Sequence, residues 1–170
     1  YGAQGSTVTA NIRDPLTGKP FVFQQGVWRY HPRTRHFELF AEGGGNIWGL
    51  DFDRHGQVIA GTNWGGAAAL HMMQEAYYVK GFAKHGPLHN PNTYGYFDHV
   101  PYEKFKGGHV TCGGIVYQAD RYPAEMHNQY IAGNLLSNAI YWHKMMPKGS
   151  SFTATHGGDL MTTDDIWFRP

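Results

Sequence analysis

Hydrophobic and polar residues alternate along this chain in short runs, and glycine, proline or asparagine interrupts the runs. A period of two is typical of half-buried β-strands. The pattern predicts strands in both halves of the chain, over residues 1–12, 27–30, 37–40, 48–52, 57–61, 114–118, 129–133, 139–143 and 152–155. Residues 67–73 favour another strand, with a short helix as the alternative.

Two stretches repeat one pattern. Residues 49–52 (G-L-D-F) precede 57–61 (Q-V-I-A-G), and residues 114–117 (G-I-V-Y) precede 129–133 (Q-Y-I-A-G). Repetition of this kind is typical of arrays of like units such as propeller blades. The sequence therefore predicts an all-β fold, a β-propeller segment of about two to three blades.

The whole chain, residues 1–170, is expected to form one partial β-propeller domain. Residues from about 80 to 108 are rich in glycine, proline, histidine and asparagine, which predicts a long loop of the kind that often carries function. Propeller rings close with roughly 4–8 blades. We therefore expect the remainder of a longer chain, or other copies of this one, to complete the ring.

The composition of the chain argues against some classes of partner. The net charge is +1 and 16% of residues are charged, which argues against a nucleic-acid partner. No apolar run approaches the roughly 18 residues that span a bilayer, and no signal peptide opens the chain, which begins at Tyr1 rather than Met. The single cysteine, Cys112, excludes an internal disulfide and is expected to be a buried, inert thiol.

Histidine is the main candidate for chemistry, with 11 residues. His109 follows two glycines, where a ligand could approach the backbone closely, so it is a candidate catalytic residue; a structural histidine is the alternative. His85 and His89 have a spacing that would suit a metal on a helix, but Gly86 and Pro87 argue against a helix there. No metal-ligand set can be named.

Two other pairs of residues are expected to have mainly structural roles. His71 and His143 each lie a few residues beyond the shared Ala-Gly and are expected to occupy corresponding positions, either packed or lining a central channel. Asp51 and Asp53 flank Phe52 and are expected to form a solvated turn.

Four stretches carry a family resemblance: residues 45–61, 107–117, 132–143 and 164–170. They are similar to the signature of a membrane-bound dehydrogenase family of planctomycete and verrucomicrobial bacteria, whose members resemble soluble quinoprotein glucose and sorbosone dehydrogenases. The resemblance implies a six-bladed propeller that holds pyrroloquinoline quinone (PQQ) and calcium. It also implies oxidation of a sugar or alcohol, cytochrome c as electron acceptor, and a periplasmic or secreted location with membrane association.

The resemblance also assigns residues. The dehydrogenases place the Arg and Asn of an R-N-P-x-G-L motif at the quinone; Asn46 matches the Asn, whereas Gly45 stands in place of the Arg. The loop that would face calcium contains Trp64 and Gly65 as candidate cofactor contacts, and it has no carboxylate.

Three hypotheses follow from the sequence. The first is a quinoprotein-dehydrogenase-like propeller, and the second is a non-catalytic propeller used for ligand binding or protein assembly. The third is a histidine-based metal or haem site near the long loop. Hydrolase, kinase and nicotinamide-dependent classes lose support, because the chain has no G-x-S-x-G, P-loop or complete Rossmann motif.

Overall fold

The computed structural model of residues 1–170 describes all of them except 80–87, 91, 105 and 107–112, and the side chains of 6–11. The predicted all-β class is confirmed. The strands are β1 (Gly2–Arg13), β2 (Pro20–His31), β3 (His36–Gly43), β4 (Leu50–Phe52), β5 (Val58–Ala60), β6 (Ala67–Met72), β7 (Ala76–Tyr78), β8 (Gly95–Phe97), β9 (Val100–Glu103), β10 (Gly114–Val116), β11 (Tyr130–Asn134), β12 (Ala139–Lys148) and β13 (Ser151–Thr162). A short 3-10 turn, η2 (Ala124–Met126), precedes β11.

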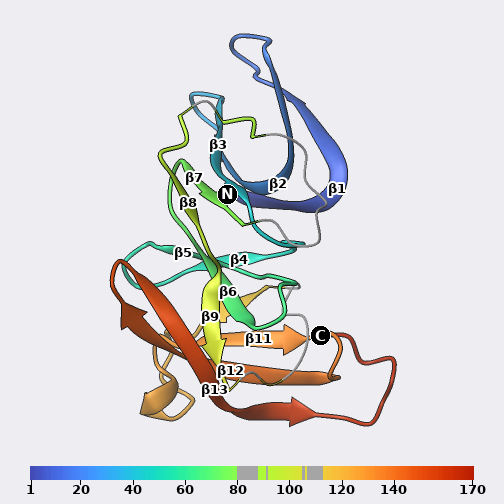
Figure 1. Ribbon diagram of the computed structural model, residues 1–170, viewed down its shortest axis with the longest axis vertical. Coiled ribbons are helices and arrows are strands. Elements are labelled where there is room, and N and C mark those ends of the chain that lie inside the picture. Colours follow the sequence, from blue (N-terminus) through green and yellow to red (C-terminus); the bar gives the residue numbers. More distant parts are fainter. Residues whose placement is uncertain (80–87, 91, 105, 107–112) are drawn as a thin grey trace.

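The strands form two sheets, which lie at opposite ends of an elongated molecule (Figure 1). One has five strands in the order β1-β2-β3-β7-β8, and the other has eight in the order β10-β11-β12-β13-β9-β6-β5-β4. The larger sheet consists of two four-stranded modules, joined where β9 and β13 pair in parallel. Within each module the neighbouring strands are antiparallel. This repetition makes the chain a β-propeller-like segment.

The two end strands of the larger sheet, β4 and β10, come together and nearly close it. The backbone N–H of Val116 donates to Oδ2 of Asp51 over 2.8 Å, and Nε2 of Gln118 donates to the carbonyl of Phe52 over 2.8 Å. Gly113 lies so close to β4 that a Cβ placed on it would be 2.6 Å from Cα of Gly49. Glycine is required here because two backbones meet without space for a side chain.

The expected solvated turn at Asp51 and Asp53 is wrong. Asp51 joins the two modules, as described above, and Asp53 is only 8% exposed. The carboxylate of Asp53 accepts the backbone N–H groups of His55 and Gln57, both over 2.8 Å. These bonds fix the β4–β5 turn from inside, so both carboxylates have structural partners.

The pairing register aligns the two repeats differently from their sequence pattern. Ala60 pairs with Leu50 and its counterpart Ala132 pairs with Gly114, so the equivalent of Gly49 is Gly113 rather than Gly114. Likewise Val58 pairs with Met72, whereas its counterpart Tyr130 pairs with His143.

The expected equivalence of His71 and His143 is therefore wrong by one residue. His143 corresponds to Met72, and His71 corresponds to Trp142. Because successive side chains of a strand point to opposite faces, this one-residue difference places the two histidines on opposite faces of their modules.

The predicted long loop, from about 80 to 108, contains two short strands, β8 and β9, in its described part. β8 pairs with β7, and β9 pairs with both β6 and β13. Strands this short are too brief to produce a clear alternation in the sequence; they form because established strands offer them unpaired backbone groups.

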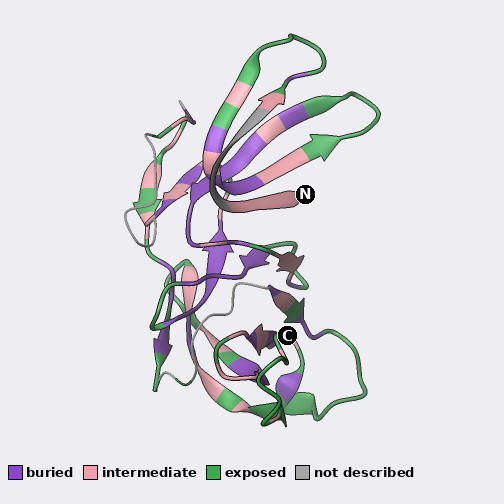
Figure 2. Ribbon diagram, turned by 90° about the vertical axis from the view of Figure 1, so that its right-hand side faces the viewer, coloured by how far each residue is buried: buried purple, intermediate pink, exposed green. Residues whose placement is uncertain are grey.

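The main core joins the two sheets. It includes Val27 and Phe40 from the five-stranded sheet, Leu70 and Met72 from the eight-stranded sheet, and Tyr78 from β7, each at most 7% exposed. In Figure 2 buried residues accordingly gather in the middle of the molecule, whereas the tips of the β1–β2 and β2–β3 hairpins are exposed. The core therefore joins the five-stranded sheet to β5 and β6 of the eight-stranded sheet.

A buried histidine lies in the second module. His143 is fully buried, and its ring packs against Tyr102 and Tyr130 with centroid distances of 5.0 and 6.0 Å. Neither of its ring nitrogens has a hydrogen-bond partner among the described residues. Burial and the neighbouring His156 lower the pKa of His143 to about 4, so the ring is neutral in the folded protein at neutral pH.

We expect Gly113→Ala to destabilise the protein much more than Gly56→Ala. Both glycines have a positive φ, +76° and +77°, so both variants carry a similar backbone strain of roughly 1 kcal/mol. Of the two, only Gly113 has backbone atoms within 4 Å of the added Cβ. This contact is expected to raise the loss of unfolding free energy in Gly113→Ala to roughly 3 kcal/mol or more. Urea denaturation measures both losses, and equal losses would contradict a close contact between β4 and β10.

We also expect His143→Met to flatten the dependence of stability on pH. The folded protein resists protonation of His143, so the free energy of unfolding falls as pH drops from about 6.5 toward about 4. Two and a half pH units correspond to a loss of roughly 3 kcal/mol from this residue. Methionine already occupies the equivalent position, Met72. Chemical denaturation of both proteins between these pH values checks the prediction; parallel curves would contradict it.

Candidate functional site

Three of the four candidate site residues lie in the described structure, at one corner of the eight-stranded sheet. Asn46 is half-buried, Trp64 is 37% exposed and Gly65 is exposed. The backbone of Asn46 binds the residue before Trp64: Oδ1 of Asn63 accepts the N–H of Asn46 over 2.9 Å, and Oγ1 of Thr62 accepts the N–H of Trp64 over 3.0 Å. His109 and Cys112 lie outside the described residues.

His99 holds this corner rigidly. Its Nε2 lies 2.6 Å from the carbonyl of Val79, and its Nδ1 lies 2.8 Å from Oγ1 of Thr62. A carbonyl only accepts, so Nε2 carries the proton and Nδ1 accepts from the threonine hydroxyl. Burial lowers the pKa of His99, which favours this neutral ring.

A shallow cleft opens beside this ring. The indole of Trp64 packs on the imidazole of His99 with a centroid distance of 5.3 Å. The cleft has a volume of about 260 Å³ and is lined by Trp64, Gly66, Ala67, Val79, Asp98, His99 and Pro101. Asn46 and Gly65 are not among its lining residues, so the structure does not gather all the expected cofactor contacts in one cavity.

The described residues of this corner do not fit the PQQ and calcium site that the resemblance implies. A Cβ on Gly45 would lie 2.5 Å from Oδ1 of Asn63 and 2.7 Å from Oγ1 of Thr62, so no arginine can replace this glycine without displacing both. These two oxygens are already engaged in hydrogen bonds. Nowhere in the described part of the chain do three His, Cys, Asp or Glu side chains gather as metal ligands.

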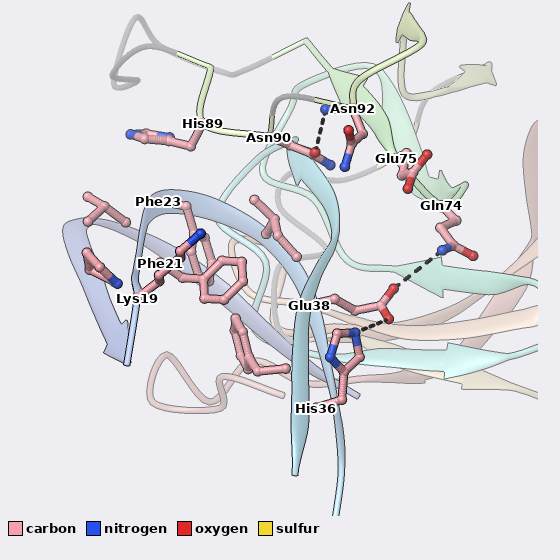
Figure 3. A pocket seen from close by; sticks show the side chains of 14 residues that line it. Lys19, Phe21, Phe23, His36, Glu38, Gln74, Glu75, His89, Asn90 and Asn92 are labelled. Carbon is pink, nitrogen blue, oxygen red and sulfur yellow. Dashed lines mark hydrogen bonds and ion pairs between the residues drawn. The ribbon is translucent and has the colours of Figure 1, made fainter. Parts of the chain in front are cut away.

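A larger pocket lies on the five-stranded sheet (Figure 3). Its volume is about 510 Å³, and it opens between β2, β3 and the residues His89, Asn90 and Asn92. Its apolar wall contains Phe21, Phe23, Phe37 and Leu39, of which the last three are at most 8% exposed. Polar side chains surround this wall: Lys19, His36, Glu38, Gln74, Glu75, His89, Asn90 and Asn92.

A carboxylate beneath the pocket fixes its upper edge. Glu42, near the end of β3, is fully buried and accepts the backbone N–H groups of His89 over 2.9 Å and Asn90 over 3.0 Å. Nδ1 of His89 lies 2.8 Å from Oε1 of Glu42. The sheet thereby positions both the backbone and the imidazole of a segment that has no regular structure of its own.

Ion pairs order the opposite edge of the pocket. Glu38 pairs with Arg29 over 2.7 Å and lies 3.5 Å from Nε2 of His36. Nε2 of Gln74 donates to the same carboxylate over 3.3 Å, as Figure 3 shows. The carboxylate therefore has partners on three sides, and the polar edge is held in place before any ligand binds.

Glu42 was not predicted as a functional residue. A signal was available, because a carboxylate follows the apolar run of residues 39–41 and would face an interior if that strand is buried. His89 was considered only as a metal ligand with His85; its partner among the described residues is Glu42, and His85 lies outside them. Sequence spacing could not reveal this pair, whose members lie 47 positions apart.

A third polar cluster fastens β9 to β13. Nζ of Lys106 binds Asp159 over 2.7 Å, Nε2 of His156 binds the same carboxylate over 2.8 Å, and Nδ1 of His156 lies 3.2 Å from the hydroxyl of Tyr102. The bond from Lys106 lowers the pKa of Asp159. These groups satisfy one another and line none of the pockets described above, so we interpret the cluster as structural.

Comparison with known families assigns the chain. Residues 1–170 match a family described as "Domain of unknown function (DUF7133)". The chain belongs to this family. Neither the curated proteins nor the solved structures contain a match to this member of DUF7133. Within the described residues, no helix is long and apolar enough to cross a membrane.

We expect Gly45→Ala to destabilise the protein by about 1–3 kcal/mol, because the new methyl group must displace the side chains of Asn63 and Thr62. Gly65→Ala is the matched control: no atom lies within 4 Å of its added Cβ, and the loss should stay within about 0.5 kcal/mol. Thermal or urea denaturation of the two variants measures the loss of stability. If Gly45→Ala is as stable as the unchanged protein, there is space beside Gly45, and a cofactor site at this corner becomes feasible again.

Proposed function

We propose that this chain is a non-catalytic ligand-binding module whose site is the pocket between β2, β3 and the residues His89, Asn90 and Asn92. The pocket carries the proposal. It combines an apolar wall of phenylalanine and leucine with polar side chains that are already held by hydrogen bonds, the usual build of a small-molecule site. Its volume of about 510 Å³ falls within the range of such sites.

The lining indicates the kind of ligand. Phe21 and Phe37 pack edge to face with a centroid distance of 4.9 Å, and such a wall suits an aromatic or aliphatic ring. The ionisable side chains at the edge include both signs, Lys19 as well as Glu38 and Glu75, so the pocket has no single dominant charge. A neutral, amphipathic molecule with one apolar face and a few hydrogen-bonding groups fits this lining best.

Sugar or alcohol oxidation with PQQ and calcium, with a cytochrome c acceptor and a periplasmic or secreted location, stays a prediction from the resemblance. The lack of space beside Gly45 and the engaged oxygens of Thr62 and Asn63 weigh against it. Assembly with the remainder of a longer chain or with other copies likewise stays a prediction. Binding, in contrast, requires only residues that the structure describes.

Calorimetric titration with para-cresol, a ring that carries one hydroxyl, tests the proposal. We expect a dissociation constant of roughly 0.1–1 mM, in line with the affinity that so few atoms can provide. Phe21→Ala removes part of the wall and should weaken binding about tenfold, because roughly 1.4 kcal/mol of apolar contact is lost. Phe168→Ala is the matched control, since Phe168 is half-buried and does not line the pocket.

Two results would contradict the proposal. One is the absence of binding by para-cresol and by related ring compounds; the other is equal weakening by the two phenylalanine variants. A parallel titration with PQQ and calcium, followed by dye reduction with an aldose, separates the rival hypothesis. Turnover in that assay would favour the dehydrogenase over a non-catalytic module.

A further inference from the structure

We infer that His89 is the hydrogen-bond acceptor for a hydroxyl group of the ligand, and that Glu42 is the positioning residue that makes it an acceptor. The ligand class is then a phenol or alcohol with an apolar body. The inference rests on the proposed function, because it names the chemistry that the same pocket selects.

The first step concerns the state of Glu42. Its side chain is fully buried, and two backbone N–H groups, those of His89 and Asn90, donate to it over 2.9 and 3.0 Å. Both oxygens accept backbone N–H groups, since the N–H of His89 also lies 3.2 Å from Oε1. A carboxylate has acceptors only, so we assign Glu42 as the acceptor toward His89.

The second step fixes the proton on His89. Nδ1 of the ring lies 2.8 Å from Oε1 of Glu42, and two acceptors cannot form a hydrogen bond. Nδ1 must therefore carry a proton and donate it to the carboxylate. In the neutral ring the other nitrogen, Nε2, then carries a lone pair and accepts. A buried carboxylate that orients an imidazole in this way fixes its tautomer.

The third step concerns direction. His89 lines the pocket, whereas Glu42 does not. The side chain of His89 remains 21% exposed, so the ring is not sealed against Glu42 on all sides. Nδ1 faces the buried carboxylate. The bonding directions of the two ring nitrogens diverge, so Nε2 points away from Glu42. Among the described residues no protein group is found to bind Nε2, which leaves this acceptor for the ligand.

The rest of the edge supports a hydroxyl as the matching group. Lys19 and the amides of Gln74, Asn90 and Asn92 can donate to oxygen atoms of a ligand, so a ligand oxygen as such would not be selected by His89. An O–H is different, because it needs an acceptor. A neutral His89 in this tautomer supplies one beside an apolar wall, and a methyl ether or ketone of the same size cannot use it.

Three probes of matched size test this: para-cresol donates a hydrogen bond, whereas para-methylanisole and para-methylacetophenone only accept. Calorimetry at about pH 8.5, where histidine side chains are predominantly neutral, gives the three dissociation constants. We expect para-cresol to bind about tenfold more tightly than para-methylanisole or para-methylacetophenone, because these two compounds have no O–H to donate to Nε2.

The decisive variant is Glu42→Gln. A glutamine can still accept the two backbone N–H groups with its oxygen, but its NH₂ group then faces Nδ1 and donates to it. The proton of His89 must move to Nε2, which becomes a donor. The preference should reverse, with para-methylacetophenone now bound more tightly than para-cresol. Glu125→Gln, at an exposed glutamate of η2, is the matched control and should keep the wild-type order.

The ring proton can also be observed directly, so the test does not depend on folding of the Glu42 variant. Nitrogen-15 NMR of wild-type protein should report the Nδ1–H tautomer of His89. The Nε2–H tautomer, or equal affinities for the three probes, would overturn the inference while leaving the pocket a binding site. Failure of all three probes to bind would overturn the proposed function and the inference together. If the Glu42→Gln variant folds and binds the three probes in the same order of affinity as the wild type, Glu42 does not position the proton of His89 and has only a structural role.

Discussion

The apolar core shared by the two sheets is the constraint on which the rest of this structure depends. Val27 and Phe40 on one side meet Leu70 and Met72 on the other, so these residues are buried only where the two sheets are joined. The five-stranded sheet is thereby covered on one side, while Phe23, Phe37 and Leu39 form a separate small cluster next to the pocket. The five-stranded sheet therefore supplies apolar residues both to the core and to the wall of the pocket.

Alternation in the sequence was enough to predict most strands, because each has one buried face and the period of two is then visible. β2 and β13 are longer than expected, since their outer ends lie in exposed hairpin arms where no buried face imposes a pattern. The repeated Ala-Gly runs correctly indicated like modules. Their register was misjudged by one residue, because pairing is set by turns and bulges rather than by residue identity.

The candidate site was harder to predict, for a different physical reason. Asn46 binds Asn63, the neighbour of Trp64, across the β4–β5 hairpin, a contact of the kind that local turns can produce. Glu42 and His89 meet only because β7 and β8 return to the five-stranded sheet and carry the intervening chain with them. No local pattern encodes that return. The lack of space beside Gly45 likewise cannot be predicted from a sequence motif, because the motif does not show which side chains surround the glycine in the fold.

The path of the chain between β6 and β9 has a consequence for how the molecule holds together. After β6 the polypeptide leaves the larger sheet, adds β7 and β8 to the smaller one, and comes back as β9. The chain crosses between the sheets three times, after β3, after β6 and after β8, so the strands of each sheet come from two separate stretches of the chain. Because of this interleaving, no single cut of the backbone separates the two sheets into two intact halves.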